Sequence, residues 1–159
     1  MHSIRRSVTF TRALALAGLS LLAFAPRARA QTALSFYPLT PCRVWDTRTT
    51  HPPQMTANAS RDFVVRGRCG VPNGAQAVAI NVTIVGPTEA GNLRIYQAGL
   101  LTPPLASLLN WAANDNPVAN GTIVPLADSG GNNVTVRIDM PTGSTGRVHT
   151  LADVTGYFQ

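Results

Sequence analysis

FYPLTPCRVWDTR, residues 36–48, is the segment around which the rest of the chain is organised. Within thirteen residues it contains three aromatic side chains, two prolines, one of the two cysteines of the chain and the triplet Asp46-Thr47-Arg48. The segments after it read as short strands, and a strand with one apolar side needs a partner sheet to bury that side. We therefore expect residues 36–48 to tie the later strands together.

Alternating apolar and polar residues indicate strands through the rest of the chain. The clearest is Ala77–Val85, in which Val78, Ile80, Val82 and Ile84 share one face, and Asn133–Met140 alternates in the same way. Further strands are expected at Ala33–Tyr37, Arg43–Thr47, Arg61–Arg66, Asn92–Tyr96, Ser107–Trp111, Thr122–Leu126 and Arg147–Phe158. No stretch after residue 30 has a sustained helical period. The pattern predicts an all-β fold, an antiparallel β-sandwich of jelly-roll or Ig-like type with 8–9 short strands.

Glycine and proline residues divide these strands. Pro38 and Pro41 are expected to end the first strand before the second begins at Arg43, and the proline-containing loop Thr49–Ser60 is expected to lack regular structure. Gly86–Gly91 is expected to turn the chain so that the strands before and after it form a hairpin. Asp128–Gly131 (DSGG) is a second tight-turn signal between two strands.

The first thirty residues have the three parts of an export signal. Arg5, Arg6 and Arg12 make the start positive, residues 13–25 (ALALAGLSLLAFA) are apolar, and Ala28-Arg29-Ala30 matches a small-residue cleavage site. The apolar run is shorter than the about 20 residues that a spanning helix needs. We expect residues 1–30 to be a secretory signal peptide and residues 31–159 to form a single domain, secreted and without a membrane anchor.

Removal of the signal peptide changes the charge of the protein. The whole chain has a formal net charge of +6 and a pI of about 10.7, but the part from Gln31 onward has eight arginines, seven acids and a net charge of +1. A nucleic-acid-binding domain is usually strongly basic. We therefore expect no nucleic-acid partner.

Cys42 and Cys69 are the only cysteines, and both follow the signal peptide. An exported chain meets oxidising surroundings, and two cysteines allow only one intramolecular pairing. A metal pair or a free nucleophile would need supporting histidines, of which this part of the chain has only His51 and His149. We expect a Cys42–Cys69 disulfide. His51 lies in the proline-containing loop and is expected to be solvated.

Several motifs, in order, resemble a bacterial extracellular β-sandwich domain family with an opening P-x-R-x-x-D-T-R, a central N-V-T strand and a closing D-V-x-G-Y-F. They are FYPLTPCRVWDTR, CGVPNGAQAVAINVTIVGPTEAGNLRIY (69–96), SLLNW (107–111), ANGTIVPLA (119–127) and HTLADVTGYF (149–158). The family occurs in exported and surface proteins of actinobacteria and other soil bacteria, often attached to enzymes or repeated in tandem. The resemblance implies a non-enzymatic accessory or surface module. The cysteine pair and the lack of an attached catalytic domain depart from the family pattern.

Charged residues inside the apolar strands are candidates for structural ion pairs. Asp46 and Asp153 lie within such strands, where a carboxylate needs an arginine or backbone donors, and Arg43 and Arg48 are the nearest arginines in sequence to Asp46. A functional interpretation stays open, because Arg48 could hold an anionic group and Asp46 could act as a base. His149, Asp153 and Ser144 suggest a hydrolase triad, although the chain lacks a G-x-S-x-G motif.

Two further site types are compatible with the sequence. Trp45, Trp111 and Tyr96, with Tyr37 and Tyr157, could stack on sugar rings if they are exposed, although aromatic residues in strands are more often buried. Oxygen-rich turns at residues 114–116 and at Asp128 with residues 132–133 could hold calcium, although they lack the D-x-D-x-D-G order of a known calcium loop.

Taken together, these features favour a secreted, non-catalytic β-sandwich that acts as a structural or interaction module in the cell envelope or outside the cell. Its partner would be another copy, joined through a sheet edge, because an edge presents unpaired donors and acceptors, or a polysaccharide or protein of the cell envelope. The alternative is a carbohydrate-binding module that recognises a cell-wall or environmental polysaccharide. We expect neither catalytic residues nor a cofactor.

Overall fold

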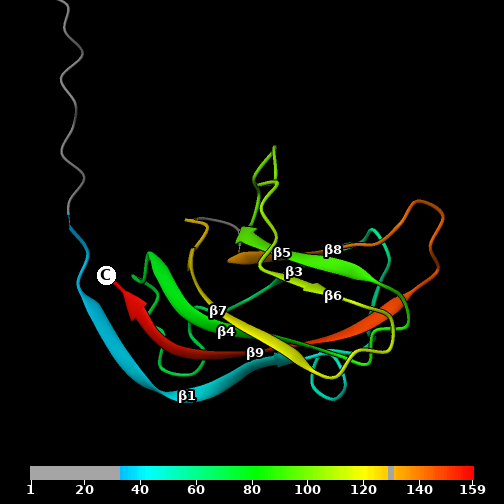
Figure 1. Ribbon diagram of the computed structural model, residues 1–159. Helices are drawn as coiled ribbons and strands as arrows, with labels where there is room; N and C mark the ends of the chain where they lie inside the picture. The colour runs from blue at the N-terminus through cyan, green and yellow to red at the C-terminus, as the bar shows by residue number, and fades with distance from the viewer. Residues whose placement is uncertain (1–32, 129–130) are drawn as a thin grey trace, which may run out of the picture. The chain divides into compact units, whose positions relative to one another are not determined.

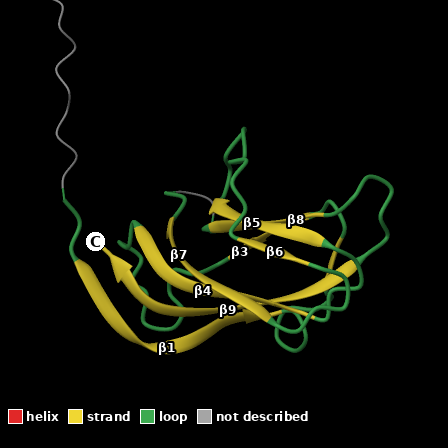
Figure 2. Cartoon of the chain, in the orientation of Figure 1, coloured by secondary structure: helices red, strands yellow, loops and turns green. Residues whose placement is uncertain are grey.

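The computed structural model describes residues 33–128 and 131–159, and Leu34–Gln159 form one compact unit. Figure 2 shows this part of the chain as strands and loops, without a helix. The signal peptide expected at residues 1–30 lies outside the described residues. Within them, no helix is long and apolar enough to cross a membrane. The strands are β1 (Phe36–Asp46), β2 (Met55–Thr56), β3 (Ser60–Phe63), β4 (Ala77–Val85), β5 (Gly91–Gln97), β6 (Leu109–Trp111), β7 (Val118–Pro125), β8 (Val134–Asp139) and β9 (Arg147–Phe158).

The nine strands form two antiparallel sheets, which Figure 1 shows as two layers. The first sheet has the order β1-β9-β4-β7, with the short strand β2 also paired to β9. The second sheet has the order β3-β8-β5-β6. The predicted all-β sandwich is therefore confirmed.

The pairing of the strands decides between the two predicted sandwich types. β1 pairs with β9, β3 with β8, β4 with β7 and β5 with β6, so the pairs are nested as in one long hairpin. The rolling of this hairpin brings β4 against β9 and β5 against β8, which completes the two sheets. Nested pairs distributed over two sheets are the arrangement of a jelly roll, so the fold is a jelly roll and not Ig-like.

Alternation along each strand places the core between the sheets. On β4, Val78, Ile80, Val82 and Ile84 are at most 2% exposed, whereas the residues between them are more exposed on the outer face. Val134, Val136 and Ile138 of β8 are fully buried from the other side. This buried apolar surface is the main source of stability of the fold.

Three details of the predicted strands are wrong. Pro38 and Pro41 do not end a strand, because β1 runs through both of them with a bulge between Pro38 and Cys42. β1 is an edge strand, where a missing N–H leaves no ladder bond unmade. The loop Thr49–Ser60 contains the short strand β2, whose Met55 is buried and pairs with Val148.

The third error concerns the expected hairpin of β4 and β5. The chain does turn between these strands, but β4 belongs to the first sheet and β5 to the second. Gly86–Gly91 therefore connects two sheets. The DSGG segment also lies between strands of different sheets, β7 and β8, and its residues 129–130 are outside the described part of the chain.

Candidate functional site

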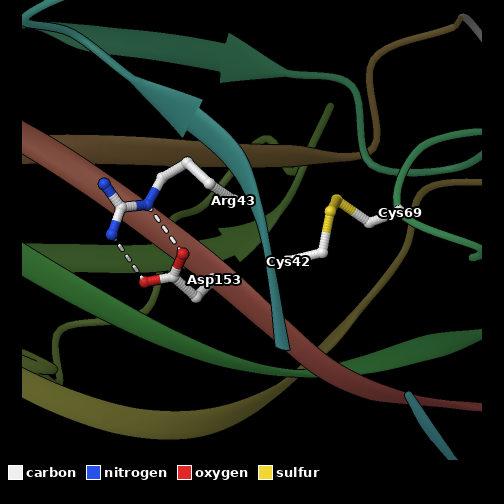
Figure 3. Close-up of a disulfide and its surroundings, with 4 residues drawn as sticks. All are labelled: Cys42, Arg43, Cys69 and Asp153. Atoms are coloured by element: carbon white, nitrogen blue, oxygen red, sulfur yellow. Dashed lines mark hydrogen bonds and ion pairs between the residues drawn. A yellow bond between two sulfur atoms is a disulfide. The ribbon is translucent and has the colours of Figure 1, made fainter. Parts of the chain in front are cut away.

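The disulfide expected from the sequence joins Cys42 of β1 to Cys69, with their Cα atoms 5.6 Å apart (Figure 3). Cys69 lies in a tight turn in which the N–H of Gly67 donates to the carbonyl of Val71 and the N–H of Val71 donates to that of Arg68. The disulfide therefore attaches this turn to the edge of the first sheet. It closes a loop between residues 27 apart in sequence.

Asp46, at the end of β1, lies between two arginines. Arg48 donates to its carboxylate from Nη2 at 2.8 Å and from Nε at 3.0 Å, and the backbone N–H of Arg48 donates to the same group at 2.9 Å. Arg43 donates to Asp46 at 3.1 Å and also holds Asp153 of β9 with two bonds of 2.7 and 3.0 Å (Figure 3). The four charged residues singled out in the sequence thus form one network across β1 and β9.

The network stabilises the charged form of Asp46, whose side chain is only 7% exposed. Hydrogen bonds from the Arg48 side chain lower the pKa of Asp46 to about 2, while burial opposes this effect and the backbone N–H of Arg48 supports it. Among the described residues, every hydrogen bond to this carboxylate comes from Arg43 or Arg48, and a carboxylate bound in this way is poorly suited to act as a base. Its position indicates a structural role.

Three of the five aromatic residues proposed for sugar stacking are buried. Trp45 is fully buried and stacks on Phe63, with ring centroids 4.4 Å apart. Trp111 is 6% exposed and donates from Nε1 to the carbonyl of Glu89, and Tyr96 is 7% exposed. The idea that these three rings form a stacking platform is therefore wrong. The exposed aromatic residues lie instead at the start of β1, where Phe36 is 50% and Tyr37 45% exposed.

The three residues that suggested a hydrolase triad, His149, Asp153 and Ser144, bond to other residues and not to one another. His149 Nδ1 lies 3.1 Å from Thr47 Oγ1, and both oxygens of Asp153 are bound by Arg43. Ser144 contacts the sulfur of Met140 and accepts the N–H of Gly146. Each member thus has a separate structural partner.

The oxygen-rich turns use some of their oxygens in local hydrogen bonds. Asp115 accepts the backbone N–H of Ala112, and the buried Oδ1 of Asn133 accepts the N–H groups of Val65 and Arg66 at 2.7 and 2.8 Å. Asn133 thereby joins the chain after β3 to the start of β8. In residues 33–128 and 131–159, no group of three or more His, Cys, Asp and Glu side chains is placed to hold a metal ion.

A pocket that the sequence analysis missed lies between the loop after β1 and the strand β3. Its volume is about 320 Å³, and its lining includes His51, Pro53, Arg61, Phe63 and Arg68. His51 was expected to be solvated, but it is half-buried and its ring bonds to Thr50 and Arg68. The available signals were a histidine beside two prolines and an arginine beside a cysteine, and neither indicates that the two segments meet.

The structure also exposes two apolar surfaces. The β5–β6 loop (98–108) projects away from the sandwich (Figure 1), and its Leu101 and Leu105 are 99% and 94% exposed. The second surface is a shallow hollow of about 600 Å³ on the outer face of the first sheet, lined by Ala79, Gly121, Ile123 and Thr155 among others. Ile123, one of the lining residues, is 60% exposed. Below, these surfaces are called the leucine loop and the Ile123 hollow.

Comparisons with known proteins give little further information. No protein-family model matches the chain, and no curated protein matches it. Among solved structures, the chain is similar to the coat protein dimer of Tobacco streak virus, with a TM-score of 0.38 and 8% sequence identity. The match covers 80% of this chain and 89% of that chain. At this level of similarity it says nothing about the function of the chain.

Proposed function

We propose that this chain is a secreted, non-catalytic β-sandwich protein that acts outside the cell or at its surface by associating with other copies of itself. The observation that supports this proposal is the pair of apolar surfaces, the leucine loop and the Ile123 hollow. Exposed apolar groups of this kind mark interaction sites in soluble proteins.

The two surfaces fit each other better than either fits itself. The leucine loop protrudes, whereas the Ile123 hollow is concave and lined mainly by small residues. The loop joins two strands of the second sheet and the hollow lies on the outer face of the first, so the two surfaces belong to different sheets of the molecule. A loop that enters the hollow of a second copy leaves a free loop at one end and a free hollow at the other. Such head-to-tail contacts continue into chains or rings.

The expected strength of this contact is modest. Burial of an exposed leucine side chain contributes about 1.5–3 kcal/mol. Association costs about 4–15 kcal/mol in lost freedom of movement. Leu101 and Leu105 together are therefore near the threshold, and we expect association only at high protein concentration or where copies are held close together on a surface.

Direct pairing of sheet edges is less well supported. β1, at one edge of the first sheet, contains Pro38 and Pro41, which have no N–H to donate to a neighbouring strand. β7, at the other edge, is approached by the β5–β6 loop, because Asn120 donates from its side chain to the carbonyl of Leu108. Both features limit pairing with a second copy.

Light scattering over a series of concentrations tests the proposal. We expect the mean mass of the purified protein to rise with concentration. The double variant Leu101→Asp, Leu105→Asp and the single variant Ile123→Asp should both remain monomeric, whereas Leu34→Asp should behave as the wild type, because Leu34 is exposed elsewhere. An unchanged monomer at the highest concentration of the wild type would contradict self-association.

Mixing the two monomeric variants gives a sharper result. One retains its hollow and the other retains its loop, so a head-to-tail contact leaves one intact interface per pair. We expect the mixture to form heterodimers and nothing larger. If the wild type associates but the mixture stays monomeric, the contact is of another kind.

Secretion is tested separately by expression of the full chain in a bacterial host. We expect the protein outside the cytoplasm to begin at Gln31, as read by N-terminal sequencing. Intact Met1 on the exported protein would contradict the proposed signal peptide.

One observation keeps carbohydrate binding as a second candidate. Tyr37 stacks on Tyr157 with centroids 5.0 Å apart and remains 45% exposed, so one face of its ring is accessible. Retention on an insoluble polysaccharide that is lost in Tyr37→Ala would support this function. Because both tryptophans are buried, their fluorescence should not change on binding.

A further inference from the structure

The pocket beside β3 contains two arginines without a carboxylate partner. No ion pair within 4.0 Å joins Arg61 or Arg68 to a carboxylate among the described residues, which include all seven acids of the chain. Arg43, Arg48, Arg66, Arg94 and Arg137 all have such a partner. Of the eight arginines in the described part of the chain, three remain, and two of them, Arg61 and Arg68, line the same pocket.

The two arginines are positioned in different ways, Arg61 by hydrogen bonds to backbone carbonyls and Arg68 by the turn to which it belongs and by the ring of His51. Nη1 of Arg61 donates to the carbonyls of His51 and Pro53 at 3.0 and 2.8 Å, which leaves its other N–H groups without a described acceptor. Arg68 belongs to the tight turn that the neighbouring Cys69 attaches to β1. A site formed in advance loses less entropy when a ligand binds.

His51 connects the two sides of the pocket. Its Nε2 lies 3.1 Å from Nη1 of Arg68, and its Nδ1 lies 2.8 Å from Oγ1 of Thr50. An arginine can only donate, so Nε2 accepts this hydrogen bond and the ring is neutral, with its proton on Nδ1. Burial lowers the pKa of His51, and the positive charges of Arg68 and Arg61 lower it further, whereas Asp46 opposes them.

The remaining walls suit an anionic group attached to a larger molecule. Phe63 forms an apolar wall, with its ring centroid 6.0 Å from that of His51, and Pro52 and Pro53 line the pocket as well. Asp62 is the only carboxylate in the lining, and its Oδ1 accepts the hydroxyl of Thr135 at 2.6 Å. Two guanidinium groups against one carboxylate leave the pocket positive.

We infer that His51, Arg61 and Arg68 form a binding pocket for a single oxyanion, a carboxylate, sulfate or phosphate group. Guanidinium groups bind such anions through charge-assisted hydrogen bonds, often in pairs. The site is separate from the leucine loop and the Ile123 hollow, so it does not depend on self-association.

Acidification should strengthen anion binding. When His51 takes up a proton, Nε2 changes from an acceptor to a donor and the bond from Arg68 is lost. The Arg68 donor and the new imidazolium charge then both become available to the anion, while Thr50 can still accept from Nδ1. The charged groups that act on the pKa of His51 are Arg68, Arg61 and Asp46, and Asp62 is the remaining charged group in the pocket lining.

Isothermal titration of the intact protein with sodium sulfate, sodium phosphate and sodium glucuronate, at about pH 5 and about pH 7.5, tests the site. We expect one site per chain and tighter binding at the lower pH. Arg68→Gln should weaken binding about tenfold or more, the loss expected for a charge-assisted hydrogen bond. The control Arg147→Gln removes the same charge from the third described arginine that has no carboxylate partner among the described residues, and it should change binding by less than about twofold.

The three anions also distinguish the sources of the ligand. Preference for glucuronate indicates acidic polysaccharides, whereas preference for sulfate or phosphate indicates esters of those acids. Arg61→Gln also removes two hydrogen bonds to loop carbonyls. Its effect on binding is therefore interpreted only if the melting temperature of the variant is unchanged. If the melting temperature falls, Arg68→Gln alone tests the site. The absence of heat with all three anions at both pH values, or equal weakening by Arg68→Gln and Arg147→Gln, would overturn the inference.

Discussion

At the scale of single residues, Asp46 links the opening segment to the closing strand. It accepts hydrogen bonds from Arg48 and Arg43, and Arg43 in turn binds Asp153. Its main-chain carbonyl accepts the N–H groups of Thr49 and His51, so it also shapes the start of the next loop. One residue therefore organises both the end of β1 and one wall of the oxyanion pocket.

Replacement of Asp46 with Asn should lower the free energy of unfolding by about 1–2 kcal/mol at pH 7, because its partners are partly exposed and screened by solvent. The pKa of Asp46 is lowered to about 2, so the ionised form stabilises the fold above the unfolded-state pKa of about 4. This stabilisation is lost as the pH falls towards 2. Thermal unfolding of wild type and variant should therefore differ at pH 7, and the difference should shrink to less than about half near pH 2.5, as the pH approaches the folded-state pKa.

Asp128→Asn is a matched control, because the side chain of Asp128 is 93% exposed. Its melting temperature should stay close to that of the wild type at both pH values. An Asp46→Asn variant as stable as this control at pH 7 would show that the network contributes nothing to stability.

The residues of the charged network were identifiable from sequence, but those of the pocket were not. A carboxylate within an apolar strand needs a partner, and this rule alone selects Asp46 and Asp153. The positions of His51 and Arg68 depend on where an irregular loop and a turn meet. No local pattern encodes that meeting.

At the scale of elements, a glycine of β9, Gly156, leaves room for the start of β1 to lie close to β9. A Cβ on Gly156 would overlap the ring of Phe36 and lie 2.8 Å from the carbonyl oxygen of Tyr37. The ring can turn away, but the carbonyl belongs to the β1 backbone. The missing side chain of Gly156 thus allows β1, with the ring of Phe36, to lie close to β9.

Gly156→Ala should lower the free energy of unfolding by about 1–3 kcal/mol, the usual cost of overpacking. Gly121→Ala, in the same sheet, is the control, because no atom lies within 4 Å of its added Cβ. Chemical denaturation of both variants measures the difference. Equal stability of the two would mean that β1 shifts without cost.

The alternation of apolar and polar residues predicts the positions of the strands in the sequence better than it predicts the sheet that each strand joins. The expected strand Arg147–Phe158 matches β9 at both ends, and Ala77–Val85 matches β4. The connection of β4 to β5 was wrong because Gly86–Gly91 marks a change of direction and contains no signal for which sheet the next strand joins. That choice is made by contacts such as Leu93 with Ile138, between residues far apart in sequence.

At the scale of the whole molecule, the disulfide is the one covalent link between distant segments of the described chain. The double variant Cys42→Ser, Cys69→Ser should lose about 3–4 kcal/mol of stability, because its unfolded chain is less restricted. A fall in melting temperature of about 10 °C or more is expected for a domain of this size. The wild type in reductant should unfold at the same temperature as the variant, and a smaller loss in both would mean that the sandwich hardly depends on this bond.

β9 has a consequence for how the protein is made. This strand is the last one in the order of the fold, and yet it pairs with β1, β2 and β4 in the first sheet. A nascent chain in which β9 has not yet been made has no strand to place between β1 and β4. The first sheet can therefore assemble only after β9 has been synthesised, so β1, the first strand to be made, waits for the last strand of the fold before it has a partner.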